Sequence, residues 1–222
     1  AFLLICTSLA ADNKPRIVIN PLGHSGKIFS VNYLPDGKTI ASVSEDKSVR
    51  VWNTETGILE NEFYTLIGDG PEGMLYTSAV SADGKFLAVA GYPMDIVDGN
   101  YIVVINLKDG EVEKAGIGHF DVINSLSFSS NNKYLASGSD DGTINLWDFN
   151  KEGKRLEIIN TINLEERVTS IDFHPTLYKL AVATESKVSR IYDLTNIRDP
   201  YFISLKKHSD QVKSIKFSPD GR

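Results

Sequence analysis

A short turn recurs along this chain at nearly constant spacing, and this repeat limits the possible folds more than any other feature. The turn reads PDGK at residues 35–38 and returns as ADGK, SNNK, PTLYK and PDGR. Its equivalent central residues are Asp36, Asp83, Asn131, Thr176 and Asp220. The steps between them are 47, 48, 45 and 44 residues, a period typical of an array of similar structural units.

Apolar and polar residues alternate around each turn, as they do in β-strands with one buried face. First strands are predicted at IFSVNY (28–33), VINSLSF (122–128), VTSIDF (168–173) and VKSIKF (212–217). After the turn follow second strands such as TIASVS (39–44) and YLASGS (134–139), and third strands such as SVRVWN (48–53) and TINLWD (143–148). Weaker fourth strands follow at ILENEF (58–63) and LEIINTI (156–162). Four such strands cannot bury both faces of their sheet alone, but radially stacked sheets cover one another.

The sequence therefore predicts an all-β fold, a β-propeller of four-stranded antiparallel blades. We expect four complete blades and partial ones at both ends, in an open or incomplete ring. Arg16–Leu22 is predicted to be an outer strand, of the kind that closes such a ring by joining the last blade. The chain stops within a hairpin at SPDGR, which favours a fragment of a longer protein whose remainder supplies the missing blades.

Two units carry a more specific pattern. They read GHSGKIFSVNYLPDGKTIASVSEDKSVRVWN (23–53) and GHFDVINSLSFSSNNKYLASGSDDGTINLWD (118–148), and His24 to Trp52 and His119 to Trp147 each span 28 residues. These units resemble the WD-repeat family, in particular bacterial WD-repeat proteins. The resemblance implies a propeller over residues 16–222, with repeats at about 23–67, 68–117, 118–163 and 164–206 and a partial one at 207–222.

The resemblance also implies a hydrogen-bonded relay of His, Ser, Asp and Trp within a blade. Its members would be His24, Ser42, Asp46 and Trp52 in the first unit, and His119, Ser137, Asp141 and Trp147 in the third. A carboxylate accepts hydrogen bonds from backbone N–H groups and imidazole, and an indole donates one, so the relay is expected to hold a turn rather than to bind a ligand. The second unit has Pro71 and Ile105 at the His and Trp positions, and the fourth has Leu164, Val182, Ser186 and Tyr192 at all four. Those two blades should depend on apolar packing.

The first residues, AFLLICTSLA, allow two interpretations. Residues 1–15 are either the end of a secretory signal, with Ser8 and Ala10 before the cleavage site, or a partial strand of a preceding unit. The first interpretation implies export to the periplasm or medium of a bacterium, and the second leaves a cytoplasmic protein.

Composition narrows the function classes. The net charge is −6, whereas a protein that binds phosphates usually carries a basic face, so nucleic acid is a poor expectation. The single cysteine, Cys6, excludes a disulfide framework and a thiolate metal cluster. No apolar run approaches the roughly 20 residues of a membrane helix. No HExxH, Gly-x-Ser-x-Gly or P-loop motif occurs.

The histidines and an insertion are the remaining chemical candidates. His24, His119 and His208 occupy the structural position of the repeat, and His174 is expected to face solvent in a turn. The insertion YPMDIVDGN (92–100) lengthens one loop, and Asp95 and Asp98 are too few ligands for a calcium loop. We therefore predict no catalytic residue, no metal and no cofactor.

A protein-binding face is predicted where the loops between blades enter the first strands. Its residues are Lys27, Phe29, Glu45, Met74, Tyr76, Val122, Asn124, Asp140, Arg167, Thr169, Gln211 and Lys213. The alternative for each apolar member is packing between blades. As a cluster they would be costly to expose without a partner.

These observations favour a non-catalytic protein–protein interaction scaffold. The first alternative is a sensor propeller within a larger bacterial enzyme, such as a caspase-fold peptidase or a kinase. The second is a propeller hydrolase with its site in the central channel, for which the first strands supply mostly Ser, Val and Ile.

Overall fold

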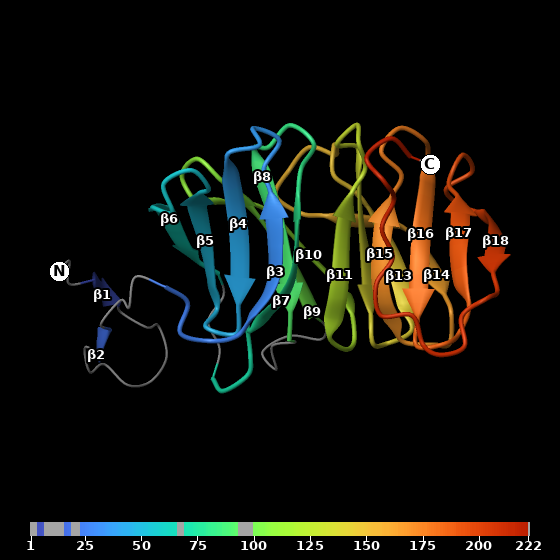
Figure 1. The fold of residues 1–222 in the computed structure, drawn as a ribbon, viewed down its shortest axis with the longest axis horizontal. Coiled ribbons are helices and arrows are strands. Elements are labelled where there is room, and N and C mark those ends of the chain that lie inside the picture. Colours follow the sequence, from blue (N-terminus) through green and yellow to red (C-terminus); the bar gives the residue numbers. More distant parts are fainter. Residues whose placement is uncertain (1–3, 7–15, 19–22, 66–68, 93–99, 222) are drawn as a thin grey trace.

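The structure is a computed structural model that describes residues 4–6, 16–18, 23–65, 69–92 and 100–221. Its described secondary structure consists of strands, which confirms the all-β prediction. Four antiparallel sheets of four strands lie side by side in chain order (Figure 1). We call these sheets blades 1 to 4. No helix among the described residues is long and apolar enough to cross a membrane.

Each blade is a meander whose strands pair with their neighbours in sequence. Blade 1 contains β3 (Ile28–Tyr33), β4 (Thr39–Ser44), β5 (Ser48–Asn53) and β6 (Leu59–Tyr64), and blade 2 contains β7 (Leu75–Val80), β8 (Phe86–Gly91), β9 (Asn100–Asn106) and β10 (Val112–His119). Blade 3 contains β11 (Ile123–Phe128), β12 (Tyr134–Ser139), β13 (Thr143–Asp148) and β14 (Glu157–Asn163). Blade 4 contains β15 (Val168–Phe173), β16 (Lys179–Thr184), β17 (Ser189–Asp193) and β18 (Tyr201–Leu205).

The apolar cores lie between blades, as the alternating pattern requires. Val43, Leu75 and Leu87 belong to the core between blades 1 and 2. Ile102 and Trp147 belong to the next core, between blades 2 and 3, and a third core joins blades 3 and 4. Full burial of such a side chain contributes about 1.5–3 kcal/mol, so each blade depends on its neighbour for stability.

The first strands of the blades adjoin in the order β3, β7, β11 and β15. Neighbouring first strands are not paired with each other by a backbone ladder. Side-chain hydroxyl groups connect them instead. The Ile171 and Phe173 N–H groups donate to the Ser125 and Ser127 hydroxyls, each at 3.0 Å. The Leu126 N–H donates to Thr77 Oγ1 at 3.2 Å. The small polar residues of these strands therefore join the blades.

The series of blades is open. Blades 1 and 4 lie at its two ends, with β6 at one side of the described blades and β18 at the other (Figure 1). β3 exposes 52% of Ile28, 53% of Val31 and 68% of Tyr33, because no described blade precedes it.

The N-terminal strands form a separate pair. β1 (Leu4–Cys6) pairs antiparallel with β2 (Arg16–Val18), with Ile5 opposite Ile17. The predicted outer strand at Arg16–Leu22 thus joins β1 in its first three residues and does not join a blade. Ser8 and Ala10 of the expected cleavage site lie outside the described residues, as does the insertion from 93 to 99.

The prediction of a first strand at Val212–Phe217 is wrong, because the structure has no strand there. The segment lies along β15 instead. The Ile215 N–H donates to Ser170 Oγ at 3.2 Å and the Phe217 N–H to Asp172 Oδ2 at 2.8 Å. These side-chain contacts continue the pattern that joins the other first strands, but no second strand is present in the described chain to complete a backbone ladder.

Candidate functional site: two buried relays and a contact face

The relay of blade 3 joins four side chains from strands β10, β12 and β13 and from the turn between the last two. The Trp147 indole N–H donates to Ser137 Oγ at 2.8 Å, and Ser137 Oγ lies 2.7 Å from His119 Nε2. His119 Nδ1 lies 3.0 Å from Asp141 Oδ2. A carboxylate only accepts, so Nδ1–H donates to Asp141, and Nε2 shares the next hydrogen bond with the Ser137 hydroxyl.

The relay of blade 1 repeats this geometry. Trp52 Nε1 donates to Ser42 Oγ at 2.8 Å, Ser42 Oγ lies 2.7 Å from His24 Nε2, and His24 Nδ1 lies 3.0 Å from Asp46 Oδ2. The two relays differ in how deeply their tryptophan side chain is buried. Trp147 is fully buried against blade 2, whereas Trp52 is half-buried because no described blade covers it.

Each relay aspartate also fixes the loops around it. Asp141 accepts from the Phe120 N–H at 2.9 Å and from the Thr143 N–H at 2.9 Å, and Asp46 accepts from the Ser25 N–H at 2.8 Å. Burial alone would raise the pKa of Asp141. Hydrogen bonds from His119, Thr143 and Phe120 outweigh it and hold that pKa well below its ordinary value, and the pKa of Asp46 is lowered in the same way. The carboxylates therefore remain ionised and tie the loop before the first strand to the hairpin turn.

The Asp–His–Ser distances match those of a hydrolase triad. Whether the serine could act as a nucleophile therefore depends on whether a substrate can reach it. Ser137 is 0% and Ser42 is 3% exposed, and each hydroxyl already receives an indole N–H. A substrate cannot reach either oxygen in this structure. These clusters hold the blades in shape.

Blades 2 and 4 lack the relay at the positions that the sequence indicates. Ile105 pairs with Leu87 as Trp147 pairs with Leu135, so it occupies the tryptophan position. In blade 4 the same position holds Tyr192, which is 3% exposed. Ser186 Oγ there accepts the Val188 N–H at 3.2 Å and lies 2.9 Å from Thr184 Oγ1, and so replaces one of the bonds of the relay aspartate.

The predicted contact residues of blades 1 and 2 form an aromatic cluster. Phe29 and Tyr76 pack edge to face with ring centroids 4.7 Å apart, and the Tyr76 hydroxyl donates to Met74 Sδ at 3.8 Å. Phe29 remains 48% exposed. Lys27 Nζ lies 3.4 Å from Glu45 Oε1 beside them. Burial, and secondly the Glu45 charge, raise the pKa of Tyr76, so its hydroxyl stays protonated.

The contact residues of blades 3 and 4 form a charged cluster. Asn124 Nδ2 donates to Asp140 Oδ1 at 2.6 Å, and Arg167 lies 4.0 Å from Asp140 and 3.7 Å from Glu185. Val122 is half-buried beside them. Thr169 Oγ1 donates to the Val212 carbonyl at 2.6 Å, and Lys213 bonds to Gln211 in the exposed segment that follows.

Two exposed aromatic residues lie next to the predicted contact residues but were not predicted among them, although Tyr92 begins the insertion 92–100. Phe120 is 83% exposed directly after the relay residue His119. Tyr92, 37% exposed, occupies the position of Glu45 and Asp140, because Gly91 pairs with Leu75 as Ser44 pairs with Ile28. Tyr92 escaped detection because blade 2 has no relay aspartate to mark its position.

The prediction for His174 requires a correction. His174, expected to face solvent, is 6% exposed. Its Nδ1 accepts from the Thr176 and Leu177 N–H groups at 3.1 and 3.0 Å, and its Nε2 lies 3.1 Å from the Gly221 carbonyl. The C-terminal segment covers it, a contact across 47 residues that no local pattern reveals. Among the described residues no three His, Cys, Asp or Glu side chains gather where they could hold a metal ion.

Comparison with known proteins agrees with this geometry. The family model "WD domain, G-beta repeat" matches residues 15–53 and 111–148, the two stretches that contain the relays. "Nuclear distribution protein PAC1" of Arthroderma otae is 26% identical over 71% of this chain and 36% of its own length. "Transducin beta-like protein 2" of Mus musculus is 24% identical over 91% of this chain and 46% of its own length. "Histone acetyltransferase type B subunit 2" of Candida glabrata is 23% identical over 91% and 48%.

Stacked four-stranded blades with two buried relays define a β-propeller with repeat architecture. The chain contains two stretches that match WD40 repeats, residues 15–53 and 111–148. It spans about a third to a half of the length of these curated relatives. They come from fungi and a mammal and do not support the predicted resemblance to bacterial members.

Proposed function

We propose that this chain is part of a non-catalytic scaffold that binds another protein through its contact face. The main support for this proposal is that the polar relays are buried whereas several aromatic side chains are exposed. The triad-like polar clusters are buried in the blades, whereas Phe120, in the loop before β11, is 83% exposed, and Phe29 packs against Tyr76 on the neighbouring blade and remains 48% exposed. Exposed aromatic side chains grouped in this way are typical of protein interfaces.

The chemistry of the face suggests how a partner would be oriented. The aromatic cluster on blades 1 and 2 offers apolar area, and the charged cluster on blades 3 and 4 offers Asp140, Arg167 and Glu185. An apolar centre supplies affinity and a charged margin supplies orientation. The net charge of −6 favours a protein over a nucleic acid as the partner.

Comparative capture tests the proposal. Phe29→Ala with Tyr76→Ala removes the aromatic pair, and we expect at least a tenfold loss of the proteins that wild type captures, measured by quantitative mass spectrometry. Tyr178→Ala is the matched control, because Tyr178 is 49% exposed, much as Phe29 is, and lies outside the face. Equal capture by the Phe29/Tyr76 variant and wild type would contradict the assignment of this face.

The alternative functions have less support. The curated relatives do not favour a sensor propeller within a bacterial peptidase or kinase. A propeller hydrolase would require an accessible nucleophile, and the serines nearest a histidine, Ser42 and Ser137, are buried.

A further inference from the structure

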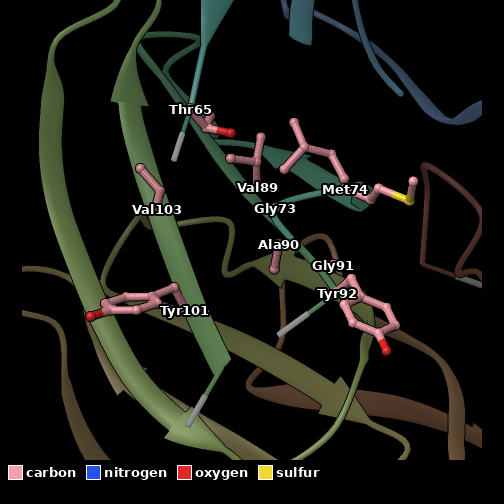
Figure 2. Close-up of a pocket in the computed structure, with 10 residues that line it drawn as sticks. Thr65, Gly73, Met74, Val89, Ala90, Gly91, Tyr92, Tyr101 and Val103 are labelled. Atoms are coloured by element: carbon pink, nitrogen blue, oxygen red, sulfur yellow. The ribbon is translucent and has the colours of Figure 1, made fainter. Parts of the chain in front are cut away.

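Further sites are sought where one unit departs from the repeat. In blade 2 apolar side chains take the place of a relay, and the hollow left beside Val89, Tyr101 and Val103 measures only about 20 Å³ (Figure 2). That space suits about one water molecule and no side chain. Blade 4 departs differently, because the turn between β15 and β16 begins with a histidine.

His174 fills a position that three other units fill with serine. Counting back two residues from the equivalent turn residues aligns it with Ser81, Ser129 and Ser218. The Ser129 hydroxyl accepts the Tyr134 N–H at 2.9 Å and so holds its own turn. A serine hydroxyl keeps its proton at every physiological pH, whereas an imidazole changes its charge close to neutral pH. Blade 4 therefore holds this turn with a titratable side chain.

The hydrogen bonds of the ring define its protonation state. His174 Nδ1 accepts the Thr176 and Leu177 N–H groups at 3.1 and 3.0 Å, and lies 3.5 Å from Thr176 Oγ1. A nitrogen that accepts N–H groups carries no proton, so the proton of the neutral ring lies on Nε2, which donates to the Gly221 carbonyl at 3.1 Å. In the imidazolium form Nδ1 also carries a proton, which would point at two N–H donors. Protonation is therefore incompatible with these contacts.

Burial strengthens this requirement. His174 is 6% exposed, and its ring packs edge to face on Phe217 with the centroids 4.8 Å apart. A buried charge is unfavourable unless a counter-charge lies beside it. Both neighbours of the ring therefore favour its neutral form.

The charged groups around the ring are already engaged. The titratable and charged residues of the elements packed around it are Asp172, Tyr178, Lys179, Lys216 and Asp220. Asp172 and Lys216 pair with each other at 2.6 Å, and Asp220 Oδ1 accepts a serine hydroxyl at 2.7 Å. Among the described residues, the hydrogen-bond partners of the ring are backbone groups and one threonine hydroxyl. A proton added to the ring would therefore meet no hydrogen-bonded carboxylate there.

The contact between His174 and Gly221 belongs to the junction between two units. Gly221 lies so close that an added Cβ would be 2.5 Å from the imidazole ring. Blades 1 and 2 meet in the same way, since a Cβ on the turn residue Gly84 would lie 3.0 Å from Pro35. His174 thus holds the segment that follows blade 4 at the place where one unit rests on the turn of the unit before it.

We propose that His174 is a pH switch that holds the C-terminal segment, residues 207–221, on blade 4 while its ring is neutral and releases it when the ring is protonated. The inference concerns the docking of this segment and does not depend on the proposed function. Release would also displace Gln211 and Lys213, two of the predicted contact residues.

The direction and size of the effect follow from proton linkage. A released histidine titrates at about pH 6.5 and binds a proton that the docked ring excludes, so docking is favoured above pH 6.5 and weakens as pH falls below it. Between pH 7.5 and pH 5.0 the ratio of released to docked segment should rise about 30-fold. Carboxyl groups ordinarily titrate near pH 4, below this window.

Hydrogen–deuterium exchange of residues 207–221, corrected for the intrinsic rate at each pH, measures this ratio. Wild type should show the rise of about 30-fold. His174→Ser installs the side chain of the other units. It loses the bond to Gly221, so its segment should exchange faster at pH 7.5, but the rise on acidification should shrink to less than about twofold. His208→Gln is the matched control, because it removes an exposed histidine of the same segment and should behave as wild type.

Nitrogen NMR of the imidazole rings tests the protonation state without a variant. At pH 7.5 the His174 ring should carry its proton on Nε2 alone. A proton on Nδ1 at this pH would overturn the inference. So would equal exchange of the wild-type segment at both pH values, or a rise in His174→Ser as large as that in wild type.

Discussion

Ser137 has two hydrogen-bonding neighbours, the Trp147 indole and the His119 imidazole, and no exposure to water. Loss of its hydroxyl would leave the buried Trp147 N–H without its acceptor and remove one of the partners of His119, which costs more than an average hydrogen bond contributes. Ser42 has the same neighbours in blade 1, but Trp52 is half-buried and its indole lies closer to solvent. Loss of the serine hydroxyl should therefore lower the free energy of unfolding less in blade 1 than in blade 3.

Ser137→Ala should lower the free energy of unfolding by about 1–3 kcal/mol, the cost of stranding buried polar groups. Ser42→Ala should lower it by about 0.5–1.5 kcal/mol, since water can reach Trp52. Urea unfolding followed by circular dichroism measures both changes. A larger loss of stability in Ser42→Ala than in Ser137→Ala would contradict this explanation from burial.

The lowered pKa of Asp141 makes stability depend on pH. A carboxyl group whose pKa is lower in the folded than in the unfolded state stabilises the fold above its unfolded value, and this contribution is lost as pH falls through the folded value. Stability should therefore decline as pH is lowered below about 4, the range of an unperturbed aspartate. Asp141→Asn should reduce both the stability at pH 7 and this decline, measured by thermal unfolding from pH 7 to pH 2. An unchanged decline in the variant would show that Asp141 is not its source.

Strands show most clearly what the sequence could predict. The predicted bounds 39–44, 48–53 and 134–139 coincide with β4, β5 and β12, because period-two alternation and the turn residues are both local signals. The prediction failed at Val212–Phe217, whose pattern is equally regular. Alternation shows that a segment can form a strand, but a strand also needs a backbone partner.

β10 shows a constraint between elements that alternation does not reveal. Its glycines Gly116 and Gly118 face Trp147 of blade 3, where an added Cβ would lie 2.8 Å from the indole ring. Neither glycine has the positive φ of a turn, so close packing accounts for them rather than backbone conformation. Trp147 is thus buried because the neighbouring outer strand lacks side chains at these two points.

Gly116→Ala should force β10 away from Trp147 and lower the free energy of unfolding by about 1–3 kcal/mol, the usual cost of overpacking. Ile117→Ala on the same strand is the control, because Ile117 is 40% exposed and should change stability much less. Chemical unfolding of both variants makes the comparison. Equal stability of Gly116→Ala and wild type would contradict the packing account.

For the whole molecule, the repeat period and the apolar pattern were enough to predict stacked four-stranded blades. Features that depend on contacts between distant residues could not be predicted. The cover over His174 comes from Gly221, 47 residues away in the sequence. Architecture therefore follows from the repeated residues, whereas contacts between distant segments cannot be read from the repeat.

The central claim is that buried polar clusters maintain the fold and the exposed aromatic cluster binds the partner. Partner capture and unfolding free energy, measured together on Ser137→Ala and on Phe29→Ala with Tyr76→Ala, test it most directly. Ser137→Ala should lose stability and keep the partner at temperatures where it remains folded, whereas the Phe29/Tyr76 variant should lose the partner with its stability nearly unchanged. Loss of the partner in folded Ser137→Ala, with full capture by the Phe29/Tyr76 variant, would contradict the account.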